Sequence, residues 1–266
     1  MEVWLFVRPK VPTYPYFCYL CAMKWIKALL MALVMGNTAC AGEGLQKDTF
    51  TTPSGKRIEI YAIKHACIRI VFDGKEIEVD PVTSLKPATD YSTLPKADLI
   101  LITHEHYDHL DAKAVKELSK PSTIIVTNQN CQKMLGKGEA IRNGDHKDME
   151  KGIAIDAVPA YNITPAHTQF HPKGRDNGFV LSLDGFRIYI AGDTEDIEEM
   201  KDIKKIDVAF LPCNQPYTMT PEQLAKAAKV INPKVLFPYH YGDTHIQQVK
   251  DLLDGSGIDV RIRNYQ

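Results

Sequence analysis

A run of histidines and aspartates near the middle of the chain has the residue types and the spacing of a metal site. Residues 103–111 read THEHYDHLD, with imidazoles at His104, His106 and His109 and a carboxylate at Asp108. In extended backbone, side chains two residues apart lie on the same side, so His104 and His106 would face one point. Imidazole suits zinc and similar divalent metals, and carboxylate adds an anionic oxygen, so this run can serve two metal ions. A polar surface loop is the alternative, but three histidines and two carboxylates seldom fall so close together by chance.

Other histidines and aspartates stand next to short apolar runs. Asp80 follows the run IEV, Asp193 follows RIYIAG and His240 follows VLFPY. His167 and His171 lie in a loop before a further apolar run. A lone aspartate at the end of a strand is more often a turn former. Short strands that end in His or Asp could nevertheless meet along one rim of a sheet sandwich, and they would then complete the site.

The elements that must position these side chains are mainly short strands. Apolar runs rich in β-branched residues predict strands at 57–63, 67–72, 76–79, 99–103, 123–126, 153–158, 179–183, 187–190, 208–211, 235–238 and 259–262. The predicted helices cover 112–118, 129–135, 221–231 and 246–253. Early residues favour strands and later ones alternate strand with helix. This order predicts two sheets with helices on their outer faces, as a single α/β domain over residues 45–266.

Three short motifs set the boundaries of these elements. Asp73-Gly74 and Asp184-Gly185 have the composition of two-residue hairpin turns. Thr220 is a typical N-cap and is followed by proline at the first helical position.

Composition excludes several classes of protein. The chain has 266 residues, 44% hydrophobic and 24% charged, which is the usual mix of a globular protein. A mostly disordered chain, a collagen-like fibre and a multi-span membrane protein are thereby excluded. The formal net charge of -1 offers no basic excess for nucleic acid. Six cysteines are too few for a disulfide-dense scaffold of this length.

Residues 23–41 have the order of a secretory signal peptide. Lys24 and Lys27 form a basic start, an uncharged apolar run of eight residues follows, and small residues end the segment. The apolar run is far shorter than the roughly 20 residues that a membrane-spanning helix needs. An ordinary buried helix is the alternative. We expect Met23 to be the true start, and residues 1–22, which lack periodicity, to be a start-site misassignment.

Cys40 leaves two forms of the exported protein open. Cleavage after Ala41 would release a soluble secreted protein, whereas acylation of Cys40 would make a lipoprotein attached to a membrane. Either form is extracytoplasmic, in the periplasm or at the cell surface. Three cysteines then remain, at 67, 131 and 213, so at most one disulfide can form.

The motifs together resemble the metallo-β-lactamase fold superfamily of metal-dependent hydrolases. The resemblance runs from about Ile58 to Arg263 and includes HEHYDH at 104–109, HA at 65, VDP at 79, PAYN at 159, HPKG at 171, AGDT at 191 and PYHYG at 238. Within this superfamily, the sequence is similar to the branch related to ascorbate-phosphate lactonases and N-acylphosphatidylethanolamine phospholipase D. The resemblance implies a four-layer αββα sandwich with a two-metal site, and it is poorly specific for the substrate.

The resemblance also implies a role for each candidate ligand. The first metal would be held by three histidines: His104, His106 and His171. The second metal would be held by one carboxylate and two histidines: Asp108, His109 and His240. Asp193 would bridge the two metals, and Asp80 would orient the HEHYDH loop from outside.

Some histidine assignments remain open at the level of sequence. His171 lies in HPKG, which resembles this branch, so it is preferred to His167 as the third ligand of the first metal. His167 would then be a loop residue or face the substrate. His65 either lines the site or is a hydrogen-bonded structural histidine. Tyr107, Tyr161 and Tyr217 either line the pocket or pack the sandwich edge, and His146 and His245 have no motif context.

The resemblance implies a hydrolytic reaction at this two-metal site. Two divalent ions, zinc or alternatively manganese or iron, lower the pKa of bound water toward roughly 7 and make hydroxide available to attack an ester, phosphodiester, lactone or amide. Asp108 would accept or relay a proton, and no Ser or Cys nucleophile is needed. The expected substrate is a small or lipid-derived molecule. The alternative is a non-catalytic metal- or partner-binding envelope protein on the same fold.

Overall fold

The computed structural model describes Met1 and residues 45–265. The expectations for residues 1–22, for the signal peptide and for Cys40 lie outside the described residues. The described residues 45–265 lie in one compact unit. Within the described part of the chain, no helix is both long and apolar enough to cross a membrane.

The domain contains two sheets of seven strands each, whose neighbours follow chain order. The first sheet contains β1 (Lys47–Thr51), β2 (Arg57–Lys64), β3 (Cys67–Phe72), β4 (Lys75–Val79), β5 (Leu99–Leu101), β6 (Ile124–Thr127) and β7 (Glu139–Ala140). The second contains β8 (His146–Asp148), β9 (Ile153–Ala160), β10 (Asp176–Leu183), β11 (Phe186–Ile190), β12 (Val208–Pro212), β13 (Val235–Tyr239) and β14 (Asp259–Val260).

Both sheets are built in the same way, from an antiparallel half followed by a parallel half. Strands β1 to β4 pair antiparallel, and β4 to β7 pair parallel. Strands β8 to β11 and β11 to β14 repeat this order. Parallel neighbours need crossover connections, which here include α2 (Ala112–Leu118), α3 (Gln129–Leu135), α4 (Pro221–Ile231) and α5 (Gln247–Leu252). Short 3₁₀ turns complete the described elements: Tyr91–Thr93, Glu150–Gly152 and Glu198–Asp202.

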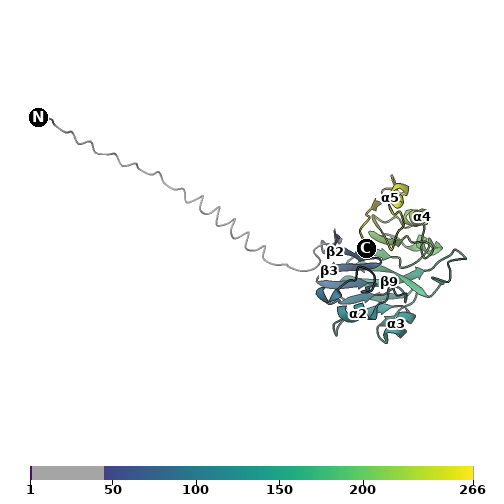
Figure 1. Cartoon of the computed structure of the whole chain (residues 1–266), viewed down its shortest axis with the longest axis horizontal. Coiled ribbons are helices and arrows are strands. Elements are labelled where there is room, and N and C mark those ends of the chain that lie inside the picture. The colour runs from purple at the N-terminus through teal and green to yellow at the C-terminus, as the bar shows by residue number, and fades with distance from the viewer. Residues whose placement is uncertain (2–44, 266) are drawn as a thin grey trace. The chain divides into compact units, whose positions relative to one another are not determined.

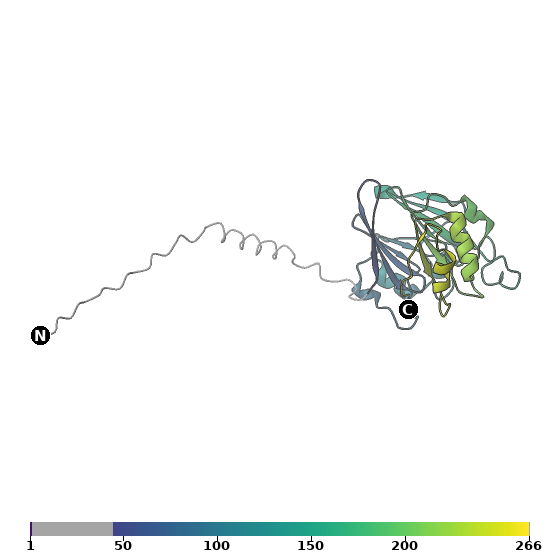
Figure 2. The same cartoon turned by 90° about the horizontal axis from the view of Figure 1, so that it is seen from above.

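The helices cover the outer faces of the sheets, so the fold is the expected four-layer αββα sandwich. Figures 1 and 2 show α2 and α3 on one side of the paired sheets and α4 and α5 on the other. Strand β5 is apolar throughout because both of its faces are buried. Leu99 and Leu101 pack between the sheets, whereas Ile100 packs outward with Val115 of α2. A strand buried on both faces has no polar side to alternate with.

The predicted elements agree closely with the structure where the local signals are strong. Helices α2, α3 and α4 have the predicted bounds, and Thr220 forms a capping box with Gln223 at the start of α4. Both predicted hairpin turns occur, with Asp73 and Asp184 at positive φ before glycine. Strand β5 was predicted to reach Thr103 but ends at Leu101.

Strand β1 was not predicted, and strand β14 is shorter than predicted. The residues of β1 include only one large apolar side chain, Phe50, so their alternation is weak. β1 is fixed instead by pairing with β2 and by ion pairs from Arg261 and Arg263 to its Asp48. These arginines follow β14, which ends at Val260.

Candidate metal centre

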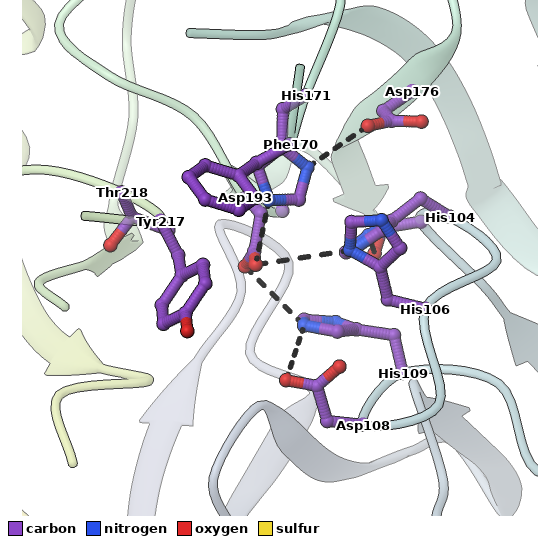
Figure 3. A network of polar contacts seen from close by, with 12 residues as sticks. His104, His106, Asp108, His109, Phe170, His171, Asp176, Asp193, Tyr217 and Thr218 are labelled. Atoms are coloured by element: carbon purple, nitrogen blue, oxygen red, sulfur yellow. Dashed lines mark hydrogen bonds and ion pairs between the residues drawn. The ribbon is translucent and has the colours of Figure 1, made fainter. Parts of the chain in front are cut away.

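Five histidines and two aspartates converge at one rim of the sandwich, because their segments follow the carboxyl ends of strands in both sheets. The HEHYDH segment follows β5, Asp193 follows β11 and His240 follows β13. His171 lies in the loop between β9 and β10. Figure 3 shows Asp193 between His171, His104 and His109. The carboxyl ends of parallel strands point to the same edge of a sheet, so the candidate ligands from these segments meet there.

The first group of possible ligands contains His104, His106 and His171. His104 Nε2 and His106 Nδ1 are 3.1 Å apart. The ring centres are 4.6 Å apart for His104 and His106, 5.0 Å for His104 and His171, and 4.8 Å for His106 and His171. A zinc–nitrogen distance of about 2.0–2.1 Å puts an imidazole centre about 3.2 Å from the ion, so two imidazoles on one tetrahedral ion have centres about 5.2 Å apart. The observed separations are close to this value.

The second group contains Asp108, His109 and His240, with His65 beside them. Asp108 Oδ2 lies 3.5 Å from His240 Nε2 and 3.9 Å from His109 Nε2. The rings of His109 and His240 have centres 5.2 Å apart, again the separation expected for two imidazoles on one ion. This second group therefore offers a carboxylate and two imidazoles that could hold a metal ion.

Asp193 reaches both groups through one carboxylate. Its Oδ2 lies 3.4 Å from His171 Nε2 and 3.3 Å from His240 Nε2, and its Oδ1 lies 3.4 Å from His109 Nε2. Ligand atoms on one tetrahedral zinc are about 3.3 Å apart. A carboxylate at these distances from both groups has the placement of a bridging ligand.

Several ligand atoms of this site are buried without a hydrogen-bond partner. They are His109 Nε2, both ring nitrogens of His240 and Asp193 Oδ1. A buried polar atom without a partner costs about 1–3 kcal/mol, so a folded protein rarely leaves several together. Lone pairs of nitrogen and carboxylate oxygen that face one another suit a cation. The residues present therefore fit divalent metal ions.

Outer carboxylates hold the imidazoles in place. Asp80 accepts hydrogen bonds from Thr103 N (2.8 Å) and Thr103 Oγ1 (2.7 Å) and contacts His109 Nδ1 at 2.8 Å. Asp176 contacts His171 Nδ1 at 3.1 Å. Each carboxylate leaves the Nε2 atom of its histidine facing the centre. Asp80 was predicted for this role, whereas Asp176 was missed because the strand that it begins was predicted to start only at residue 179.

The backbone of the site is strained at three positions. His65, Asp80 and His240 have φ angles of 51°, 44° and 49°. Residues other than glycine seldom adopt this left-handed conformation, which costs of order 1–3 kcal/mol each and is concentrated at functional sites. These residues directly follow β2, β4 and β13, so the strained backbone lies where three strands of the two sheets end at the site.

The charges of the site favour a cation at its centre. Burial, with the neighbouring His109, lowers the pKa of His104 well below its ordinary value. Burial also opposes a charge on His109, but the carboxylates of Asp193 and Asp108 raise the pKa of His109 well above the ordinary value. Burial would raise the pKa of Asp193, but His240 and His109 outweigh it and hold that pKa well below the ordinary value. Two anionic carboxylates that stabilise a proton on His109 would equally stabilise a metal cation.

The structure separates the two histidines that the sequence left open. His171 lies with His104 and His106, whereas His167 Nδ1 contacts the buried Glu195 at 3.1 Å. Glu195 also accepts hydrogen bonds from two backbone amides of the same loop, so this pair holds the loop in place.

The three candidate tyrosines differ in their surroundings. Tyr217 lies beside Phe170, with ring centres 4.9 Å apart, and both are near Asp193 in Figure 3. Tyr107 is largely exposed, and the Tyr161 hydroxyl donates a hydrogen bond to Glu199 away from the ligands. A role for Tyr217 as a wall of the site stays a prediction. Cys67, Cys131 and Cys213 are buried and free, so none of the three forms a disulfide.

Most of the domain is similar to known proteins. Residues 59–240 match the family model of the beta-lactamase superfamily domain. A UPF0173 metal-dependent hydrolase from Ligilactobacillus salivarius is 36% identical over 189 residues, which are 66% of this chain and 82% of that protein. A crystal structure from Parabacteroides distasonis, described as a candidate metal-dependent hydrolase, is 56% identical with a TM-score of 0.81 and covers 84% of this chain and 100% of its own. A metallo hydrolase from Ignicoccus hospitalis is 25% identical with a TM-score of 0.66, over 78% of this chain and 95% of its own.

Proposed function

This chain belongs to the metallo-β-lactamase superfamily of metal-dependent hydrolases, and on that premise we propose that it uses two divalent metal ions to hydrolyse an ester, phosphodiester, lactone or amide. Zinc is the expected metal, since imidazole nitrogen predominates among the ligands, with manganese or iron as alternatives. The first ion would be held by His104, His106 and His171. The second would be held by Asp108, His109 and His240. Asp193 would bridge the two ions.

The position of Asp193 carries this proposal. It is buried, and its two oxygens face nitrogen atoms of both histidine groups at 3.3 to 3.4 Å. A single ion would need only one of these groups. A carboxylate between two groups, next to buried ring nitrogens without partners, supports two neighbouring ions.

The chain contributes orientation, exclusion of water and a proton acceptor. When bound, two such ions would lower the pKa of water toward roughly 7 and stabilise negative charge on the substrate. The side chains of His104 and His109 are fully buried and that of Asp193 is 3% exposed, so these ligands are shielded from bulk water. Asp108 is 17% exposed, the most of the seven proposed ligands apart from the half-buried His106, and it is the carboxylate that can pass a proton to solvent. We therefore assign Asp108 the role of proton relay.

The metal content of the protein tests the proposal first. Purified residues 42–266 should hold about two divalent ions per chain, and removal of both by a chelator should lower hydrolysis at least about 100-fold until metal is returned. The substrate class would be identified by a screen of esters, phosphodiesters, lactones, N-acyl amides and β-lactams. A protein that binds no metal after refolding in excess zinc would contradict the two-metal hydrolase.

We also propose that the mature protein acts outside the cytoplasm on a small or lipid-derived molecule, because residues 23–41 have the order of an export signal. Mass spectrometry of the protein from its natural host should find a mature chain that begins at a fatty-acylated Cys40 or at Gly42. A Cys40→Ala substitution should prevent the acylation if the lipoprotein form is correct. An N-terminal peptide from within residues 1–22 would contradict both the export signal and the predicted start at Met23.

A further inference from the structure

His65 lies beside Asp108, His109 and His240 of the second group, but it has no role among the proposed ligands. It lies in the turn between β2 and β3, and its Nε2 atom is 3.1 Å from Asp108 Oδ2. Its ring lies against that of His240, with centres 3.8 Å apart. The side chain is 19% exposed. Two roles fit the contact with Asp108: ligation of the same ion, or a hydrogen bond to the carboxylate.

Ring geometry distinguishes these roles. Two imidazoles on one tetrahedral ion have centres about 5.2 Å apart, and about 4.5 Å apart if they bind at a right angle. The proposed ligand pairs within each group have separations from 4.6 Å (His104 and His106) to 5.2 Å (His109 and His240). His65 is 3.8 Å from His240 and 6.1 Å from His109, outside this range on both sides. Such a ring packs against the His240 ligand and does not share its ion.

The backbone holds His65 firmly in this place. Its N–H donates to Tyr265 O (2.6 Å), and its carbonyl accepts from His240 N (3.1 Å). The chain before Tyr265 is fixed in turn, since Tyr241 Oη donates to Arg263 O and Arg263 pairs with Asp48. The left-handed conformation of His65 aims its ring at the site and is maintained by these contacts.

We propose that His65 is a positioning residue whose Nε2–H donates a hydrogen bond to Asp108 Oδ2 and so holds this carboxylate toward the second metal ion. The inference rests on the proposed two-metal function. Asp108 is the more exposed of the two proposed carboxylate ligands, with a side-chain exposure of 17% against 3% for Asp193. Among the described residues, its contacts are with imidazoles only. His65 therefore gives Asp108 the outer support that Asp80 and Asp176 give to His109 and His171.

Three substitutions separate the hydrogen bond from the ring. His65→Ala removes both, His65→Phe keeps a ring against His240 without the N–H, and His65→Gln supplies an amide N–H near the position of Nε2. Zinc affinity should be measured by competition titration for each ion, and the cobalt-substituted proteins compared by visible absorption. We expect the Ala and Phe variants to bind one of the two ions about 10–100-fold more weakly, the effect typical of losing an outer hydrogen bond to a ligand. The other ion should be unaffected.

The Gln variant should retain the wild-type affinity within about threefold and leave the cobalt bands unchanged, because the coordinating atoms stay the same. A Gln variant that loses the ion as the Ala variant does, or that shifts the cobalt bands, would make His65 a ligand and overturn the inference. So would Ala and Phe variants that bind both ions normally. His146→Ala, at an exposed histidine that pairs with Asp148 and Asp156, is the matched control. If the wild-type protein itself bound fewer than two ions, the proposed function would fail instead.

Discussion

Replacing Asp193 with alanine should weaken the binding of both metal ions, by roughly 100-fold or more for each, which exceeds the 10–100-fold effect of losing an outer contact. The reason is that Asp193 faces His171 and His240 through one oxygen and His109 through the other. Without it, Asp108 would be the only carboxylate left among the proposed ligands of two cations. Metal content after dialysis and zinc titration of the purified variant measure the effect.

Two control variants sharpen this result. Asp193→Asn keeps the shape and one oxygen, so it should retain part of the affinity for one ion and less for the other. Asp156→Ala, at a surface carboxylate that pairs with His146, should change neither. If Asp193→Ala released one ion and left the other at wild-type affinity, Asp193 would not be a bridge.

The second large effect is a difference in metal binding between variants of His171 and His167, which lie in one loop. His171→Ala should abolish binding of the first ion, because His171 Nε2 faces Asp193 and the ring lies 4.8 and 5.0 Å from those of His106 and His104. His167→Ala should leave both ions bound, since its ring nitrogen contacts Glu195 instead. Zinc titration of the two variants side by side provides the comparison. The reverse pattern would transfer the ligand role to His167.

A variant of Asp176, the carboxylate behind His171, should have an intermediate affinity for the first ion. Asp176 contacts His171 Nδ1, so Asp176→Asn keeps the size of the side chain and removes its charge. First-ion affinity should fall about 10–100-fold, between the values for His167→Ala and His171→Ala. An Asp176→Asn variant as impaired as His171→Ala would indicate that the loop itself had moved.

The chemistry of the site and most of the elements could be predicted from local sequence. The HEHYDH segment contains four candidate ligands in one strand-end loop, and each of the remaining ones stands beside an apolar run or within a recognisable motif. Helices α2, α3 and α4 begin and end where caps and periodicity place them. These signals lie within a few residues of one another, so they can be detected without knowledge of the fold.

His65, Asp176 and strand β1 show where local sequence is insufficient. A single histidine in a hairpin turn has the same local pattern whether it is a surface residue or, as here, lies 3.1 Å from Asp108. Asp176 contacts His171 only because the loop before β10 folds back over the rim. β1 depends on ion pairs with arginines more than 200 positions later. None of these partners can be identified by periodicity.

The kinds of ligand available and the strands that carry them follow from local sequence, because side-chain chemistry and alternating burial are local properties. Which nitrogen faces which oxygen depends on the folded domain, which brings the rims of two separate sheets together, puts Asp193 between the two histidine groups, and places His65 against His240. Distances of 3 to 4 Å between residues far apart in the sequence depend on how the sheets pack, and packing is a property of the whole domain.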